Sequence, residues 1–238
     1  MKNLENKTVL ITGGSKGIGY GIAKVLLKEK AKVALTSRDQ NAADEAAKSL
    51  ATSGGDVFGI ASDVRNADSQ NKAVKQVVER WGKLDVLVAN AGLGHFGSIE
   101  DLSADQWQET IDTNLTGVFH SVKASIPALK ESKGYIITIA SLAGTNFFAG
   151  GSAYNASKFG LVGFSQAIML DLRNYGIKVT TIMPGSVATH FNGAHPDKED
   201  AWKIQPEDIG ELVLDLLQMH PRTLPSKIEV RPSIAGKG

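Results

Sequence analysis

Hydrophobic residues along the chain fall into two alternating kinds of segment. Short runs that are apolar almost throughout are typical of parallel strands covered on both faces. They occupy residues 8–11, 32–36, 57–61, 84–88, 135–139, 177–182 and 228–230. Between them, apolar residues recur every three or four positions, as on amphipathic helices, at residues 22–30, 41–50, 68–81, 104–130, 152–174 and 206–219. The alternation predicts an α/β protein built on a doubly wound parallel sheet with helices on both faces.

Length and composition fit one such unit. The chain has 238 residues, of which 42% are hydrophobic and 21% charged, and this suits a single domain over residues 1–238 with a sizeable core. Residues 186–205, after the sixth strand, follow neither pattern and include two His, two Asp and one Phe. A long irregular segment inside a compact domain is usually functional, so we expect it to be a loop over the substrate.

Charge and cysteine usage narrow the classes of partner. The 26 basic and 25 acidic residues leave a formal charge of +1. This balance does not indicate the excess of basic residues that binding to nucleic acid or to an anionic membrane surface requires. The absence of cysteine excludes disulfides and thiolate metal sites, and the histidines show no paired ligand spacing for a metal. No apolar run resembles a signal peptide or reaches the roughly 20 residues that span a bilayer, so we expect a cytoplasmic protein.

A glycine-rich turn joins the first strand to the first helix. It runs Thr12-Gly13-Gly14-Ser15-Lys16-Gly17-Ile18-Gly19. Glycines let the backbone approach a ligand closely, and the N–H groups of the following helix then face an anion such as a pyrophosphate. A tight turn without a ligand is the alternative. The order strand, turn, helix favours the Rossmann-type unit that binds dinucleotides.

The tip of the second strand bears on which dinucleotide is bound. In such folds this tip meets the adenosine ribose, where an acidic side chain favours a free hydroxyl and a cation favours a 2′-phosphate. Here the tip carries Ser37 and Arg38, and Lys16 in the glycine turn can approach the same group. These residues predict NADP(H). The alternative is that both cations are solvated and that Asp39 contacts the ribose.

A tyrosine and a lysine lie one helical turn apart in the segment 152–174. Tyr154 and Lys158 therefore share a helix face. A nearby cation stabilises a phenolate and lowers the pKa of the phenol, which makes tyrosine a usable acid–base group. Ser141 follows the fifth strand directly and can bind the same substrate oxygen. An isolated pair of this kind is more often an ordinary helix surface, so the serine strengthens the catalytic interpretation.

Together these motifs resemble the short-chain dehydrogenase/reductase family over essentially the whole chain. Those that carry the resemblance are Thr12-Gly13-Gly14-Ser15-Lys16-Gly17-Ile18-Gly19, Asp63-Val64, Ala89-Asn90-Ala91-Gly92, Asn114, Ser141, Tyr154-Asn155-Ala156-Ser157-Lys158 and Pro184-Gly185. The resemblance also implies a homotetramer or homodimer, paired through the helices of residues 104–130 and 152–174.

The resemblance implies a role for each residue of the site. Tyr154 is then the acid–base, Ser141 orients the substrate oxygen, and Lys158 binds the nicotinamide ribose and lowers the tyrosine pKa. Asn114 would hold a water in a proton relay to Lys158, although the residues alone show only a polar side chain in a long helix. The expected cofactor-binding set is Gly13, Ser15, Lys16, Gly17, Ile18, Gly19, Ser37, Arg38, Asp63, Val64, Asn90, Ala91, Gly92, Tyr154, Lys158, Pro184, Gly185, Val187 and Thr189.

These expectations define an NADP(H)-dependent oxidoreductase that interconverts a carbonyl and an alcohol and uses no metal. Leu142, Phe147, Phe148 and Phe191 would line an apolar pocket for a hydrophobic ketone or aldehyde, although Phe147 and Phe148 fit a core position equally well. An NAD-dependent alcohol dehydrogenase is the nearest alternative. A cofactor-sensing protein without catalysis is a second, since a fold alone does not fix function.

Overall fold

One parallel sheet organises the molecule. The computed structural model describes residues 4–52 and 54–234, and in these its strands run in the order β3-β2-β1-β4-β5-β6-β7. All neighbouring strands pair in parallel. The strands are β1 (Thr8–Ile11), β2 (Lys32–Ser37), β3 (Val57–Ala61), β4 (Val86–Ala89), β5 (Tyr135–Ile139), β6 (Lys178–Pro184) and β7 (Lys227–Val230). The order reverses between β1 and β4, which confirms the doubly wound topology and marks the ligand-binding edge.

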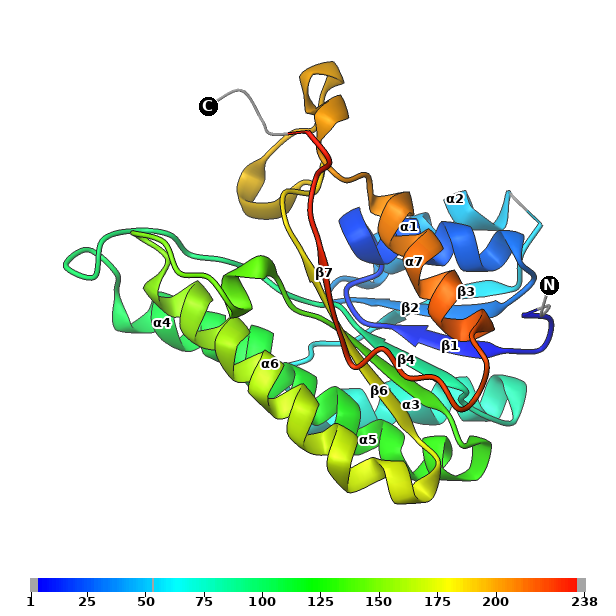
Figure 1. The fold of residues 1–238 in the computed structure, drawn as a ribbon. Helices are drawn as coiled ribbons and strands as arrows, with labels where there is room; N and C mark the ends of the chain where they lie inside the picture. Colours follow the sequence, from blue (N-terminus) through cyan, green and yellow to red (C-terminus); the bar gives the residue numbers. More distant parts are fainter. Residues whose placement is uncertain (1–3, 53, 235–238) are drawn as a thin grey trace.

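Helices cover both faces of this sheet, as Figure 1 shows. One layer holds α1 (Gly17–Lys28), α2 (Gln40–Ala51) and α7 (Pro206–Gln218), and the other holds α3 (Ala67–Trp81), α4 (Ala104–Ile111), α5 (Gly117–Ser132) and α6 (Ser152–Leu172). Within the described residues, no helix combines the length and the apolar character needed to cross a membrane.

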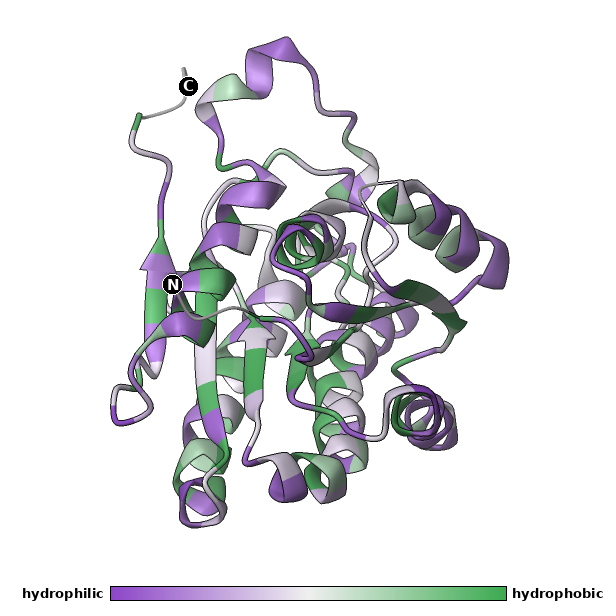
Figure 2. Ribbon diagram, turned by 90° about the vertical axis from the view of Figure 1, so that its right-hand side faces the viewer, coloured by the Kyte–Doolittle hydropathy of each residue, from purple (hydrophilic) through white to green (hydrophobic). Residues whose placement is uncertain are grey.

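The core is divided in two by the sheet. Along β1, Val9 and Ile11 face the cluster under α1, α2 and α7, whereas Leu10 between them faces the cluster under α3, α5 and α6. Because successive strand residues point to opposite faces, a strand buried on both must be apolar at every position. The inner strands are accordingly mainly green or white in Figure 2, whereas β7 at the sheet edge alternates between green and purple.

One predicted element is interrupted. The single helix expected over residues 104–130 is wrong in one respect, because α4 ends at Ile111 and a π-helical turn, Asp112–Thr116, precedes α5. The N–H of Gly117 bonds to the carbonyl of Asp112 across five residues. This turn carries Asn114, whose side chain is fully buried and held by hydrogen bonds to Leu93 and Ser157. The tertiary bonds of this amide account for the local widening, as is frequent for π-turns at functional sites.

Candidate active site

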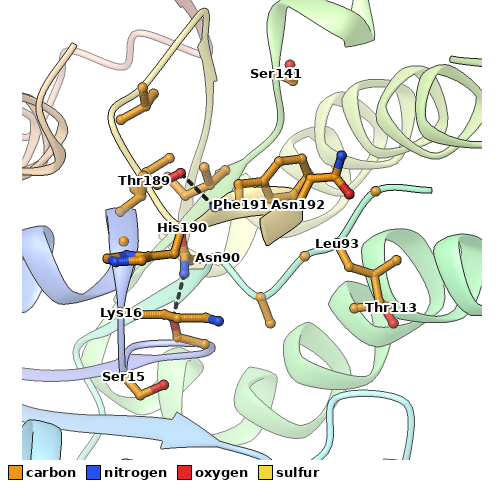
Figure 3. Close-up of a pocket in the computed structure, with 18 of the residues that line it drawn as sticks. Ser15, Lys16, Asn90, Leu93, Thr113, Ser141, Thr189, His190, Phe191 and Asn192 are labelled. Atoms are coloured by element: carbon orange, nitrogen blue, oxygen red, sulfur yellow. Dashed lines mark hydrogen bonds between the residues drawn. The ribbon is translucent and has the colours of Figure 1, made fainter. Parts of the chain in front are cut away.

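A cleft of about 820 Å³ runs along the carboxyl ends of the strands, where the order of the sheet reverses. In Figure 3, Ser15 and Lys16 lie on one side of it, Leu93 and Thr113 on another, and Ser141 beyond. The cleft gathers most of the residues expected from the sequence: Gly13, Ser15, Lys16, Gly17, Ile18, Ser37, Arg38, Asp63, Val64, Asn90, Ala91, Gly92, Ser141, Tyr154, Lys158, Pro184, Gly185, Val187 and Thr189. Gly19 and Asn114 do not line it.

The glycine turn has the geometry of a phosphate cradle. Gly13 and Gly17 have φ values of 63° and 58°, in the left-handed region that glycine adopts readily. A Cβ on Gly13 would lie 2.9 Å from the Cα of Ala91, so a side chain there would push the turn away from the neighbouring strand end. The side chain of Asn90 anchors the turn by donating to the carbonyls of Thr12 and Gly13, each at 3.0 Å. The N-terminus of α1 therefore opens into the cleft and fits the pyrophosphate of a dinucleotide.

Gly19 does not line the cleft. It is buried behind the turn, and a Cβ there would lie 2.6 Å from Nδ2 of Asn90. Its missing side chain makes room for the Asn90 anchor, and a contact of Gly19 with the cofactor stays a prediction.

Charged groups gather at the tips of β2 and β3. Arg38 is 67% exposed and its Nη1 lies 4.0 Å from Oε1 of Glu109 on α4. Asp39 borders the same end of the cleft, but its Oδ1 caps helix α2 by accepting from the N–H of Ala42 at 2.8 Å. Arg65 binds both carboxylate oxygens of Asp63, and these hydrogen bonds hold the pKa of Asp63 below its ordinary value against the effect of partial burial. The tip therefore offers Arg38 as its most accessible cation.

Ser141, Tyr154 and Lys158 converge on the other half of the cleft. Lys158 is only 5% exposed, and its Nζ donates to the carbonyl of Ile139 at 3.0 Å and lies 5.7 Å from the centre of the Tyr154 ring. Burial lowers the pKa of Lys158 to about 8. These three side chains come from the end of β5 and from one face of α6. They can bind, orient and protonate a substrate oxygen at one point.

The tyrosine pKa differs from the expectation. Burial raises the pKa of Tyr154 above its ordinary value, and the interaction with the Ser141 hydroxyl opposes that rise without cancelling it. The expected lowering by Lys158 is therefore corrected for this state of the protein. The ammonium is bonded to Ile139 instead, and removal of the phenol from water dominates. Tyr154 is thus a neutral phenol, which is the form that donates a proton.

Asn114 does not line the cleft but holds two segments of its wall together. Its Oδ1 accepts from the N–H of Leu93 at 2.9 Å, and its Nδ2 donates to the carbonyl of Leu93 at 2.8 Å and to Oγ of Ser157 at 3.0 Å. These bonds tie the chain after β4 to α6. The side-chain amide of Asn114 thus already has protein partners for its donors and its acceptor. Participation of Asn114 in a proton relay stays a prediction.

An aromatic cluster surrounds Tyr154, and one of its members was not expected. The ring of Phe96 lies 5.3 Å from that of Tyr154 and 6.0 Å from that of Phe148. Phe191 completes it, with its ring 5.7 Å from Tyr154 and 6.3 Å from Phe96. The sequence offered one indication that Phe96 belongs to the site, namely its position shortly after the small residues that end β4. Ligands bind outside such strand ends.

The cleft lining includes one of the four expected pocket residues, Phe191, and leaves out Leu142, Phe147 and Phe148. Phe147 is 87% exposed and belongs neither to the core nor to the cleft. Leu142 packs toward Gly185, whose added Cβ would lie 3.1 Å from its Cδ1. The helical turn that follows Ser141 directs Leu142 away from the cleft. In the described part of the chain, no three histidine, aspartate or glutamate residues are arranged to hold a metal ion.

Comparison with known proteins identifies the family. Residues 7–200 match the model of the short chain dehydrogenases, so the chain belongs to this family of oxidoreductases. An uncharacterised oxidoreductase of Staphylococcus aureus is 33% identical over 233 residues, covering 98% of this chain and all of that protein. The glycine betaine reductase ATRR of Emericella nidulans is 32% identical over 96% of this chain, which spans only 19% of that longer protein.

A solved structure agrees with the fold in detail. It is the alcohol dehydrogenase of the archaeon Thermococcus sibiricus complexed with 5-hydroxy-NADP. The TM-score is 0.89 at 32% identity, with 95% of this chain and 97% of that chain covered. The fold and the family therefore point to a nicotinamide cofactor, and the cradle of Gly13 and Gly17 fits one.

Proposed function

We propose that this protein is an NADP(H)-dependent reductase of hydrophobic ketones or aldehydes. The observation that carries the proposal is the convergence of Ser141, Tyr154 and Lys158 in the same cleft as the glycine turn. A protein that only sensed the cofactor would not need this set of proton-handling groups. The same residues run the reverse reaction, alcohol oxidation, when the concentrations of substrate and product favour it.

Each residue has a distinct task in the reduction. When bound, the nicotinamide cofactor supplies the hydride that reduces the carbonyl carbon. Ser141 donates a hydrogen bond to the carbonyl oxygen and fixes its position. Tyr154 then gives its proton to that oxygen as the carbonyl becomes a hydroxyl, and the raised pKa keeps the phenol protonated beforehand. Lys158 stabilises the tyrosinate left behind.

NADP(H) is proposed over NAD(H) from the charges at the adenosine end. Lys16 and Arg38 both border the cleft there. A guanidinium is a permanent cation with a fork of donors that suits a phosphate. The NAD alternative depends on Asp39, and the Oδ1 of this residue accepts the hydrogen bond that caps α2. The NADP analogue bound by the Thermococcus sibiricus relative supports the same choice.

The substrate proposal rests on the aromatic cluster. Phe96 and Phe191 pack against the Tyr154 ring and are 42% and 38% exposed, and Phe148, which packs against Phe96, is 47% exposed, so their faces are available to a ligand. Phe191 belongs to the segment 186–205, which we propose closes over the nicotinamide and excludes water. No arginine lies between Arg173 and Arg222, so this segment provides no bidentate clamp for a carboxylate or phosphate.

The proposal includes a homotetramer or homodimer in the cytoplasm. Large apolar side chains are exposed on α4, α5 and α6: Trp107, Phe119, Phe159 and Leu170. Side chains of this kind on adjacent helices are typical of a surface that pairs with a second copy. Sedimentation at micromolar concentration tests this part, and a species of monomer mass alone would contradict it.

The decisive experiment is a panel of matched carbonyl substrates assayed with NADPH and with NADH. The para-carboxamide and the para-carboxylate of acetophenone differ in charge at nearly equal size, and a decrease in nicotinamide absorbance reports the reaction. We expect NADPH and the neutral substrate to give the higher kcat/KM. A preference for the anionic substrate would contradict the pocket assignment, and no turnover with any carbonyl or alcohol would contradict the enzyme.

A further inference from the structure

Glu109 on α4 links three separate segments at the adenosine end of the cleft. Its Oε2 lies 2.9 Å from Nε2 of His95, in the segment after β4. Its Oε1 lies 3.4 Å from Nη1 of Arg65, after β3, and 4.0 Å from Nη1 of Arg38, at the tip of β2. Contacts with His95, together with the two arginines, hold the pKa of Glu109 below its ordinary value despite some burial, so the residue is an anion at neutral pH.

The two arginines differ in how closely carboxylates bind them. Arg65 is bonded to both oxygens of Asp63 through Nε and Nη2, at distances of 2.7 to 3.1 Å. Arg38 has no such carboxylate at hydrogen-bond distance among the described residues, and it is the more exposed of the two at 67% against 36%. The charge of Arg38 is therefore the one available to a ligand, and Glu109 is the carboxylate placed to share it.

A 2′-phosphate at Arg38 would meet this carboxylate. The phosphate carries close to two negative charges and would bind a guanidinium whose Nη1 lies 4.0 Å from Oε1 of Glu109. Attraction to Arg38 and repulsion from Glu109 then act on the same group. At partly exposed positions such a repulsion is modest but measurable. NADH, which lacks the phosphate, would not experience it.

We propose that Glu109 sets the cofactor selectivity of this enzyme by competing with the 2′-phosphate for Arg38. The carboxylate keeps the preference for NADPH over NADH smaller than Lys16 and Arg38 alone would give. The inference rests on the NADP(H) preference proposed above. His95 and Arg65 hold the carboxylate in place, so Glu109 acts through its charge and not by contact with the reacting atoms.

The test compares dissociation constants, measured by fluorescence titration of the purified protein with NADPH and NADH. Glu109→Gln keeps the shape and removes the charge. We expect the NADPH dissociation constant to fall about three- to tenfold and that of NADH to stay within about twofold. Asp105→Asn is the matched control, because Asp105 is exposed on the first turn of the same helix. It should change neither constant, and raising the salt should shrink the Glu109 effect.

A double-mutant cycle with Arg38→Ala assigns the mechanism. In the Arg38→Ala background the Glu109→Gln effect on NADPH should shrink, because the competition for the arginine is lost and only the direct repulsion between the carboxylate and the phosphate is left. The inference is overturned if Glu109→Gln weakens NADPH, changes both cofactors equally, or acts undiminished without Arg38. If Arg38→Ala itself leaves NADPH binding intact, the proposed NADP(H) preference fails instead, which is a separate result. Thermal unfolding midpoints equal to that of the parent protein exclude a folding defect.

Discussion

The two halves of the cleft are built in different ways. At the adenosine half, backbone and short turns form the wall, and its charged side chains extend into solvent. At the catalytic half, the working side chains come from α6 and from three long connections, and Lys158 is almost wholly buried. Burial tunes proton transfer in the second half, whereas exposure leaves charge free for recognition in the first. Substitutions in the two halves should therefore separate chemistry from cofactor choice.

The largest expected effect is at Tyr154. Tyr154→Phe keeps the ring contacts with Phe96 and Phe191 and removes only the hydroxyl. Turnover should fall by about a hundredfold or more, the usual size of lost acid–base catalysis, while the NADPH dissociation constant hardly changes. Steady-state assays and fluorescence titration measure the two quantities. Tyr175→Phe, at an exposed tyrosine beyond α6, is the control, and near-normal turnover of Tyr154→Phe would refute the assigned role.

The next effect sharpens the comparison from the adenosine half. Arg38→Ala should weaken NADPH binding about ten- to hundredfold, since hydrogen bonds between charged groups contribute about 1.5–3 kcal/mol. NADH binding and the turnover of bound substrate should change little. Arg222→Ala removes an exposed arginine after α7 and serves as the control. Equal weakening of both cofactors would show that Arg38 supports the fold of the cleft and does not select the phosphate.

A smaller effect is expected within the aromatic cluster. Phe96→Ala should lower kcat/KM for an aryl ketone about two- to tenfold, because a ring contact contributes about 0.5–1.5 kcal/mol beyond its buried area. A small aliphatic ketone should be affected less. Phe147→Ala removes an 87% exposed ring outside the cleft and should leave both substrates unchanged. Parallel losses for the aryl and the small ketone would mean that Phe96 positions Tyr154 and does not bind substrate.

The smallest expected effect is on pH dependence. Because burial lowers the pKa of Lys158 to about 8, its charge is present below that pH and is lost as the pH rises through it. NADPH, an anion, should therefore bind about two- to fivefold more weakly at pH 9 than at pH 7. Lys158→Met should remove most of this dependence. A pH dependence that persists in that variant would place the titrating group elsewhere.

The placement of residues around the adenosine half could largely be predicted from the sequence, while their contacts with a cofactor stay predictions. Gly13 and Gly17 answer a local backbone requirement, and Arg38 follows directly on a strand end, so neighbouring residues carry the information. The buried place of Gly19 could not be predicted in this way, because it involves close packing against Asn90, which is distant in the sequence.

The catalytic half was less accessible to sequence reasoning. The Tyr154 and Lys158 pair follows from helix periodicity, but the pKa of the tyrosine depends on burial, which no local pattern shows. Phe96 acquires its significance only from side chains on other segments, and the same holds for Glu109 beside the adenosine half. The π-turn was missed for the same reason, since the bonds that favour it reach Leu93 and Ser157.

That turn is the one place between α4 and α5 where the helix holds a residue more than regular winding needs. Each residue of an α-helix advances the chain by about 100° around its axis, but the bond from the N–H of Gly117 to the carbonyl of Asp112 spans five residues and takes up the extra one locally. Deleting one residue within Asp112–Thr116 would therefore remove the widening and leave α4 and α5 in the same phase. One residue added within the regular winding of α5 would instead rotate the residues on its two sides by about 100° relative to one another.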